Sequence, residues 1–595
     1  MTYRTTLQLL VLALLFLAVG CGAGPANEQA ANSAGGQGVS PAVVKLQLDA
    51  EPDQLNPVLT LSNYSNTVIG SAFSYLQTLN PATMEMEPAL AARPPEVQLL
   101  EEGPYAGGVS YSFEIRPEAV WDNGSPVTAA DFLFTLKATF NPKVPAPAYR
   151  VYLSFIKEVR IDPGNPRKFT VFSDQKYIIG EEAISAALPV LPAYHYDSLG
   201  LMAEIELQDL MDQQKAKALA ENDERISQFA TQFTSAFFSR EPKGVTGSGP
   251  YRLVRWETGQ RLVLKRKEDW WGDQVPDSPN ALQAYPQQII FRVIQDPTAA
   301  VAALKDGQLD VLANIGPEQF LELKATDFVA EQFNFHTPAS LVHTFIYVNT
   351  RSPKLEDARV RRALAYATDV ETMISSAFSG LAQPSTGPVH PTFSYYNKEV
   401  QAIPYDAEKA RALLTEAGWT DSNDNGIVDK SINGERTELT LEYKYTAGRQ
   451  VSQNIALLLQ ESARKAGIDI QLSAQEHNVN MEDLNRRDFE LMVGAKGIQP
   501  TPWEPKQDFH SEGDDRTGFA TPETDALIDR IQVTLDQEER RELYLELQEK
   551  LYQAMPIIPI LVPTGRLIIH KRLQTPITPV FPGYDPVLLR LKTEG

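Results

Sequence analysis

Apolar and polar residues alternate over residues 111–115, which predicts a half-buried strand. A turn is predicted directly after it, because Asn123-Gly124 accepts positive φ at low cost. Thr128 and Asp131 then form the pattern of a capping box. A helix is expected from there, since apolar residues recur at helical spacing: Phe132, Leu136 and Phe140.

Two contrasting stretches follow. Residues 201–241 are rich in charged residues, Gln and Ala, which predicts a surface helix and an insertion. From Gly247 the alternation returns, with Leu253 before a turn at 257–259 and apolar residues at 262 and 264 after it. This second stretch is expected to form a β-hairpin.

The pattern changes between residues 340 and 555 to helices that alternate with short apolar strands. Helices are predicted at 357–379, 406–417, 451–466 and 536–555, and strands at 439–445, 468–473 and 489–493. Such alternation indicates an α/β region with crossover connections. Pro556 stops the last helix, and the apolar run 557–562 is expected to be a strand that returns to the first domain.

The first 42 residues differ from the rest. Arg4, an apolar run at 7–19 and small residues before Cys21 are the parts of an export signal. The run of about 13 residues is shorter than the about 20 that a membrane span needs. It is similar to a bacterial lipoprotein signal with Cys21 as the lipidated residue, although Ala18 stands where the pattern usually has Leu. The alternative is an ordinary signal peptide with a chance cysteine. Residues 22–42 lack apolar bulk and are expected to be a flexible tether.

Bulk composition narrows the classes of function. The chain has 595 residues, of which 43% are hydrophobic, so two or three domains are expected. Its net charge of −22 argues against nucleic acid as a partner. With a single cysteine, zinc-finger, thiol-protease and redox classes are excluded. No G-x-S-x-G elbow, Walker loop or H-E-x-x-H helix is present.

Several separated segments carry recognisable motifs: Leu55-Asn56-Pro57, Glu87-Pro88-Ala89-Leu90-Ala91, YSFEIRPEAVWDNGSPVTAADFLF at 111–134, GSGPY at 247–251, DARVRRALAYATD at 357–369 and YDAEKARALLTEAGW at 405–419. Together they resemble the family 5 extracellular solute-binding proteins, the large peptide- and nickel-class receptors of ABC importers. The resemblance runs in family order from about residue 45 to about residue 590.

The resemblance implies an α/β, two-lobed fold of the periplasmic-binding-protein type (type II, large class), with an extra inserted α+β domain and two crossover hinge strands. It implies seven parts: 1–20 lipoprotein signal peptide, 21–42 tether, 43–82 lobe I, 83–245 inserted domain II, 246–338 lobe I, 339–555 lobe III and 556–595 lobe I. The hinge segments are expected near 343–349 and 556–563. Such a chain closes around a ligand when a few backbone dihedrals change.

The resemblance also suggests where a ligand is held. Peptide-binding members carry Phe-Asp-x-x-x-x-Gly-Trp with an Asp shortly after it that pairs with the peptide ammonium. In this chain the Trp position is Lys496 and the Asp position falls near Gln499, which carries no charge. Glu504 is the candidate replacement, or else a solvated loop residue. Lys496 either meets an anionic ligand group or points to water.

Other candidates rest on motif position. Trp503 stacks on a ligand or only packs its Pro-rich loop. Tyr149 aligns with an aromatic residue that faces ligand in peptide receptors. Four residues follow Leu55-Asn56-Pro57 at the distance of a ligand-touching loop: Leu61, Ser62, Asn63 and Tyr64. For each, a core or surface role is the alternative.

Two metal signals are weak. The segment 421–429 resembles the first half of an EF-hand loop, with Ile432 where the bidentate Glu belongs. Its calcium candidates are Asp421, Asn423, Asn425 and Asp429, and a plain hairpin turn is the alternative. His336 and His343 are seven residues apart around a predicted strand and point to opposite faces, so they cannot share a metal without ligands from elsewhere. No metal site is predicted from them, and a nickel site stays open as an alternative because the family includes nickel receptors.

The functional hypothesis is a monomeric, lipid-anchored extracytoplasmic receptor in the periplasm or on the outer cell surface. It captures oligopeptides and delivers them to the permease subunits of an ABC importer, without a cofactor and without enzymatic activity. One alternative is a receptor for a sugar, a metal chelate or a signalling peptide that is sensed and not imported. Another is an extracytoplasmic hydrolase on a two-lobed scaffold.

Overall fold

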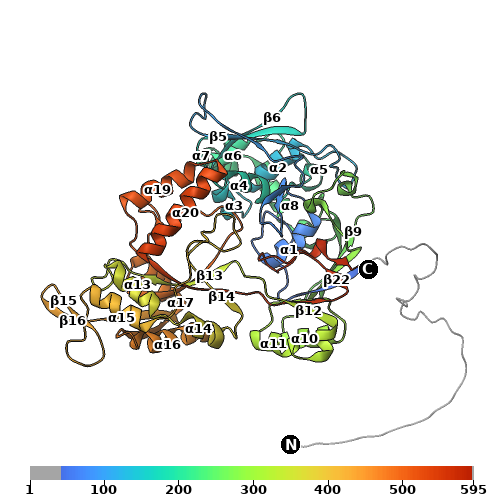
Figure 1. The fold of residues 1–595 in the computed structure, drawn as a ribbon. Coiled ribbons are helices and arrows are strands. Elements are labelled where there is room, and N and C mark those ends of the chain that lie inside the picture. The colour runs from blue at the N-terminus through green and yellow to red at the C-terminus, as the bar shows by residue number, and fades with distance from the viewer. Residues whose placement is uncertain (1–41, 593–595) are drawn as a thin grey trace, which may run out of the picture. The chain divides into compact units, whose positions relative to one another are not determined.

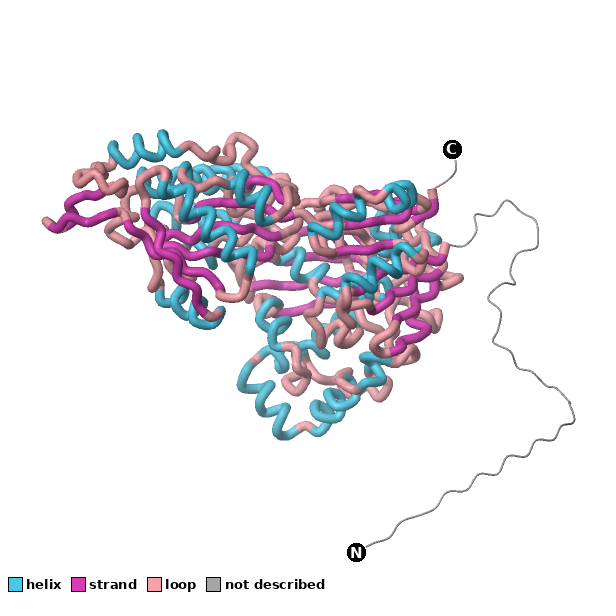
Figure 2. Tube along the Cα trace, turned by 90° about the horizontal axis from the view of Figure 1, so that it is seen from below, coloured by secondary structure: helices cyan, strands magenta, loops and turns pink. Residues whose placement is uncertain are grey.

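The computed structural model of the chain describes residues 42–592. The expected signal peptide, the lipidated Cys21 and the tether up to residue 41 lie outside the described residues. Figure 1 shows the arrangement of the elements, and Figure 2 shows strands (magenta) running alongside helices (cyan), as expected for a mixed α/β chain. No helix within the described range combines the length and the hydropathy of a bilayer-spanning segment.

The first large sheet has seven strands drawn from three separate stretches of the chain. Its order is β12 (Phe333–His336), β21 (Leu567–His570), β11 (Val311–Ala313), β1 (Val43–Leu48), β10 (Gln288–Val293), β9 (Arg261–Arg266) and β8 (Tyr251–Glu257). The predicted hairpin is β8 and β9, which pair antiparallel. The helices that follow strands of this sheet in the sequence are α1 (Asn63–Ala72), α10 (Pro297–Lys305), α11 (Pro317–Lys324) and α12 (Asp327–Gln332).

In chain order, a four-stranded antiparallel sheet follows β1 and precedes β8, the next strand of the seven-stranded sheet. Its order is β4 (Glu96–Leu99), β5 (Val109–Glu114), β7 (Lys168–Ser173) and β6 (Ile156–Ile161). The predicted strand at 111–115 is β5, whose alternating apolar side chains are buried. The predicted capped helix is α2 (Ala129–Phe140), where the Asp131 carboxylate accepts the Thr128 amide at 2.9 Å. Two short helices follow α2 in the same region of the chain: α3 (Pro147–Tyr152) and α4 (Gly180–Ala186).

The stretch 201–241 is not one surface helix but four short ones, preceded by α5 (Ala193–Tyr196): α6 (Leu207–Met211), α7 (Gln213–Asn222), α8 (Glu224–Phe233) and α9 (Ala236–Arg240). The predicted helical structure is confirmed, and two aspartates account for two of the divisions. The Asp212 side chain accepts the Lys215 amide and the Asp223 side chain accepts the Arg225 amide, and an N-cap of this kind begins a new helix. Several apolar side chains of the stretch are also buried, among them Ile226, Phe229 and Phe233.

The second large sheet has six strands: β14 (Ala382–Pro384), β20 (Ile557–Pro563), β13 (Val342–Val348), β19 (Leu491–Gly497), β17 (Thr440–Thr446) and β18 (Asp469–Gln475). β17 and β18 are parallel, and α16 (Gln450–Arg464) is their crossover, as the alternating pattern predicted. The other helices of this part are α13 (Ala358–Tyr366), α14 (Val370–Ala377), α15 (Ala407–Glu416), α17 (His477–Arg486), α18 (Lys506–Phe509), α19 (Pro522–Val533) and α20 (Gln537–Ala554).

One predicted helix of this part, 357–379, is in fact the pair α13 and α14. The Asp369 carboxylate accepts the amide of Thr372 at 3.0 Å and so caps a second helix inside the apolar pattern. The other three predicted helices, at 406–417, 451–466 and 536–555, agree with α15, α16 and α20. Asp406 and Asp536 cap α15 and α20, and Gly418 and Gly467 adopt positive φ just past α15 and α16.

The chain passes between the two large sheets twice, side by side. The apolar run 557–562 was expected to return to the first domain, but β20 belongs to the six-stranded sheet, and β21 makes the return. The expected hinges near 343–349 and 556–563 are likewise strands of that sheet, where β13 is hydrogen-bonded on both sides. The linking residues are therefore 337–341 and 564–566, which share one isolated bridge, Ala339 to Thr564.

Small elements complete the structure. Three two-stranded sheets are β2 (Gln77–Leu79) with β3 (Met86–Pro88), β15 (Asp429–Ile432) with β16 (Glu435–Glu438), and β22 (Leu573–Gln574) with β23 (Arg590–Leu591). Three 3₁₀ turns are η1 (Trp271–Gln274), η2 (Asn280–Leu282) and η3 (Pro586–Leu588). One apolar cluster joins Ile178 and Ile179, next to α4, to Phe345 of β13 and to residues of α19 and α20. The boundaries of the seven expected parts stay a prediction.

Candidate functional site

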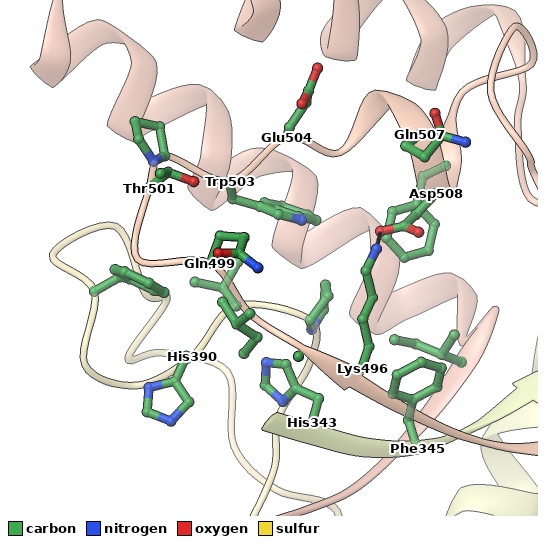
Figure 3. A pocket seen from close by; sticks show the side chains of 18 of the residues that line it. His343, Phe345, His390, Lys496, Gln499, Thr501, Trp503, Glu504, Gln507 and Asp508 are labelled. Atoms are coloured by element: carbon green, nitrogen blue, oxygen red, sulfur yellow. Dashed lines mark hydrogen bonds and ion pairs between the residues drawn. The ribbon is translucent and has the colours of Figure 1, made fainter. Parts of the chain in front are cut away.

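A cavity of about 500 Å³ lies where β13 and β19 meet the loop that follows β19 (Figure 3). The loop at 388–395 forms another wall, and Tyr152 and Ile179 reach it from the region of the four-stranded sheet. Most of the lining is apolar or aromatic. Among the residues predicted for the site, four line this cavity: Lys496, Gln499, Trp503 and Glu504.

The two strands present their side chains to the cavity through their register. His343, Phe345 and Tyr347 alternate along β13 and all line it, because side chains two apart share a face. His343 pairs with Lys496 and Phe345 pairs with Gly494 of β19. A Cβ at position 494 would come within 2.7 Å of the Phe345 ring, so glycine makes room for the aromatic side chains.

Aromatic side chains fix the loop at 499–505. The Tyr544 hydroxyl donates to the Trp503 carbonyl at 2.6 Å, and the Tyr395 hydroxyl donates to the Thr501 carbonyl at 3.2 Å. The rings of Tyr395 and Tyr544 lie 4.7 Å apart, and those of Trp503 and Tyr544 5.8 Å apart. Trp503 therefore both packs its loop and presents a face to the cavity, so the two interpretations of this residue are compatible.

Lys496 is exposed and does not point to water alone. Its ammonium forms an ion pair with the Asp508 carboxylate at the side of the cavity, as Figure 3 shows. An exposed pair of this kind contributes little to stability. The pair leaves Lys496 beside the cavity and able to exchange Asp508 for an anionic ligand group.

Glu504 and Gln499 lie in the same loop without side-chain partners. Neither side chain makes a hydrogen bond or ion pair within residues 42–592. Glu504 keeps an exposed surface, yet partial desolvation, followed by the charge of Asp508, raises the pKa of its carboxyl. Lys496 and Lys506 act in the opposite direction. A carboxylate without a partner beside aromatic rings is suited to receive a cationic group.

The sequence reasoning missed the histidines of the cavity. His343 was considered only for a metal, and His390 was not singled out. Their rings lie 6.1 Å apart and both line the cavity. Burial lowers the pKa of His343 to about 3 and that of His390 to about 4. The alternation of His343, Phe345 and Tyr347 along one strand was the signal that would have indicated a shared face.

The other predicted contacts lie elsewhere. Leu61 is 65% exposed, Ser62 caps α1 and Tyr64 meets the ring of Phe581 edge to face at 5.4 Å. The Tyr149 hydroxyl donates to the Thr60 carbonyl at 3.1 Å, which brings it next to that loop. None of these residues, nor Asn63, is in the described lining of the cavity, so their role in ligand contact stays a prediction.

The Asp-rich segment 421–429 uses its oxygens internally. Asp421 accepts the Gly426 amide at 2.8 Å, and the Asn425 side chain donates to Glu438 at 2.8 Å. Asn423 also contacts Glu438, at 3.4 Å. Asp429 accepts from Ser422 and from Arg436, and the Arg436 hydrogen bond lowers the pKa of the Asp429 carboxyl to about 2. These contacts are those of a hairpin turn.

His336 and His343 lie on strands of different sheets, β12 and β13. Within residues 42–592, no group of three or more His, Cys, Asp or Glu side chains is arranged to hold a metal ion.

Comparison with known proteins identifies the family. Residues 85–515 match the bacterial extracellular solute-binding proteins, family 5 Middle. The chain belongs to this family. It is therefore a solute-binding protein of an extracytoplasmic class, and not an enzyme, as predicted.

Relatives within the family bind different solutes. The chain is 25% identical over 582 residues to the oligopeptide-binding protein AppA of Bacillus subtilis, which covers 96% of this chain and 94% of AppA. It is 26% identical over 328 residues to the nickel-binding periplasmic protein of Escherichia coli, which covers 53% of this chain and 59% of that protein.

A solved structure confirms the predicted two-lobed binding-protein fold. The unliganded open form of MppA, a periplasmic murein tripeptide binding protein, superposes with a TM-score of 0.73. The superposition covers 93% of this chain and 98% of MppA at 17% sequence identity. At this identity the likeness establishes the fold alone.

Proposed function

We propose that this family 5 protein is a lipid-anchored receptor that captures oligopeptides and delivers them to an ABC importer. The observation that carries the proposal is the aromatic cavity with the unpartnered Glu504 on its wall. Full-length similarity to an oligopeptide-binding protein supports the same class of solute.

The composition of the cavity fits a peptide. Its volume of about 500 Å³ is within the usual range for small-ligand sites. Large rings supply rigid contact area, while a few polar groups fix orientation. In such a site the peptide backbone makes most of the hydrogen bonds and its side chains enter water-filled pockets, so peptide sequence is read loosely.

Glu504 is the proposed partner of the peptide ammonium. Gln499, at the usual position of the charged residue, has no charge to offer, whereas Glu504 lies five residues further along the same wall. Lys496 is proposed to bind an anionic group of the ligand, because such a group can compete with Asp508 for the Lys496 ammonium. Trp503 is proposed to cover the peptide between them.

Contacts from the loop 61–64 and from Tyr149 are proposed to form when the lobes close. Ligand binding favours the closed form, which the importer recognises. The two links at 337–341 and 564–566 are the proposed hinges, because a single bridge joins them. Cys21 is proposed as the lipid attachment that keeps a monomeric receptor at the membrane.

Thermal unfolding with a peptide library tests the proposal. At 100 times its dissociation constant, a ligand adds about 2.7 kcal/mol to stability, so binding peptides should raise the Tm of a protein of this size by about 2 degrees. Monosaccharides and a nickel–histidine chelate serve as controls for the other solute classes. A Tm shift with a control and none with any peptide would overturn the proposed solute. Turnover of a peptide would favour a hydrolase.

A further inference from the structure

Two nitrogens of residues that line the cavity, His343 Nε2 and Arg516 Nε, have no hydrogen-bond partner within residues 42–592. His343 lies on β13 with 4% of its surface exposed, and its Nε2 makes no hydrogen bond within residues 42–592. The residue lines the cavity, next to the base of Lys496 (Figure 3). A buried polar atom without a partner costs stability, so a group that arrives with the ligand is the natural partner to satisfy it.

The other ring nitrogen defines the tautomer. His343 Nδ1 lies 3.4 Å from the Ser385 hydroxyl oxygen. That hydroxyl has a single proton, which it donates to the Gly387 carbonyl at 3.2 Å. With that proton on Gly387, the Ser385 oxygen is left to accept from His343, and the tautomer that satisfies this contact has its proton on Nδ1. Nε2 is left as a bare lone pair, which accepts but does not donate.

The surroundings keep this imidazole neutral. Burial, followed by the neighbouring His390 and the ammonium of Lys496, lowers the pKa of His343 to about 3, although a hydrogen bond to the Pro388 backbone acts to raise it. His390 does not compete for Nε2, because its own Nε2 donates to the Ser340 carbonyl at 3.1 Å and its Nδ1 accepts the Thr392 amide at 3.2 Å. Asp508 takes the Lys496 ammonium.

We propose that His343 is a specificity-determining residue whose Nε2 accepts a hydrogen bond from a neutral N–H or O–H group of the bound solute. This inference rests on the proposed function, in which the group is a backbone amide or a polar side chain of the peptide. His343 would then read the ligand on the β13 side of the cavity, while Glu504 holds the ammonium on the loop side.

Two variants of the same position separate acceptance from packing. His343→Gln can present its amide oxygen near the place of Nε2, whereas His343→Leu fills the space without an acceptor. His336→Gln, a half-buried histidine on β12 outside the cavity lining, is the matched control. The probe is the tightest-binding member of a library of unmodified tetrapeptides, and its analogues with each backbone amide N-methylated or each polar side chain replaced by alanine.

The expected result is a specific pattern of affinities. His343→Leu should bind the probe about five- to tenfold more weakly, as for one lost hydrogen bond, and His343→Gln and His336→Gln should stay within about twofold of the parent chain. One probe analogue should lose a similar factor with the parent chain and nothing further with His343→Leu. Equal affinities of parent and His343→Leu, or no coupling with any analogue, overturn the inference while peptide binding itself stands.

A second measurement does not depend on peptide binding. Nitrogen NMR of ¹⁵N-histidine-labelled, ligand-free chain, assigned with His343→Gln, should show Nδ1 of His343 protonated and Nε2 bare between pH 6 and 8. The opposite tautomer, or a protonated ring, would overturn the inference. If no library member binds at all, the proposed function fails, and the bare Nε2 still defines a hydrogen-bond acceptor for another solute.

Discussion

Two polar loops of this chain, one at 496–509 and one at 421–429, differ in what their polar groups contact. In the turn at 421–429 the Asp421 oxygens accept backbone amides, and Asp429 accepts from Ser422 and Arg436. In the cavity loop, Glu504 and Gln499 have no such partners within the described residues, and the pKa of the Glu504 carboxyl is raised. The pKa of Asp429 is instead lowered, to about 2.

The difference teaches that residue type does not distinguish a binding loop from a structural turn. Both loops contain carboxylate and amide side chains. In the turn the side-chain oxygens of the four calcium candidates, Asp421, Asn423, Asn425 and Asp429, have internal partners, so binding a cation there would first break existing hydrogen bonds. In the cavity loop the aromatic residues hold the backbone, which leaves the polar side chains available. Three predictions test this contrast and one extends it to a buried carboxylate outside both loops; they are given from the largest effect to the smallest.

The largest effect is expected from Glu182 of α4, another carboxylate without a full set of partners. Its Oε2 has no hydrogen bond within residues 42–592, and burial raises its pKa to about 7. The folded state therefore holds this proton more tightly than the unfolded state. The contribution of the Glu182 carboxyl to the free energy of unfolding is complete below the unfolded pKa of about 4.5. It is lost as the pH rises through the folded pKa of about 7, and the loss amounts to up to ~3 kcal/mol.

Glu182→Gln should remove that loss, so the variant should be more stable than the parent at pH 8 and similar to it near pH 4.5, as measured by denaturant unfolding at both values. Glu523→Gln is the control, because the ion pair with Lys550 lowers the pKa of Glu523 and should produce the opposite trend. A Glu182 variant with no pH-dependent gain would show that the carboxyl finds solvent.

Trp503→Ala should have the next largest effect. Its half-buried ring packs against Tyr544 and Phe509, so truncation should cost ~2 kcal/mol, about half the value for a buried aromatic residue. Urea unfolding measures the loss, and peptide-induced Tm shifts should shrink with it. Trp503→Phe keeps an apolar ring and should retain most of the stability. Full stability of the alanine variant would mean that the ring does not fix the loop.

Glu504→Gln should weaken a peptide with a free amino terminus by about tenfold, which is ~1.4 kcal/mol and within the range for a charged hydrogen bond. The acetylated form of the same peptide should lose much less, because it has no ammonium. Calorimetric titration of both peptides measures the difference, with Gln507→Glu as a charge control on the same wall. Equal losses for both peptides would remove Glu504 from the ammonium-binding role.

The smallest effect is expected from calcium. Because Asp429 is engaged by Arg436 and Asp421 by backbone amides, millimolar calcium should not change Tm, and neither should a chelator. Asp421→Asn should respond to calcium as the parent chain does. A rise in Tm with calcium that Asp421→Asn abolishes would show that the turn rearranges into a metal site, and the contrast between the two loops would fail.

Much of the local structure followed from sequence. Asp406 and Asp536 cap their helices, and the strands β5, β17 and β18 lie where alternation or apolar runs placed them. The divisions within two predicted helical stretches have one cause. Asp212, Asp223 and Asp369 each accept a backbone amide inside a helical pattern and so divide it. Periodicity reports the apolar face of a helix but not these caps, whose geometry depends on the side-chain rotamer.

The family motifs by themselves determined the class of this protein, its two-lobed fold and four residues of the cavity wall, Lys496, Gln499, Trp503 and Glu504. Only the tertiary structure decided that His343 lies opposite Lys496, and that its Nε2 is left without a partner. The physical reason is that strand register and the competition for hydrogen bonds join residues more than 150 positions apart. Such long-range pairings cannot be predicted from local sequence patterns.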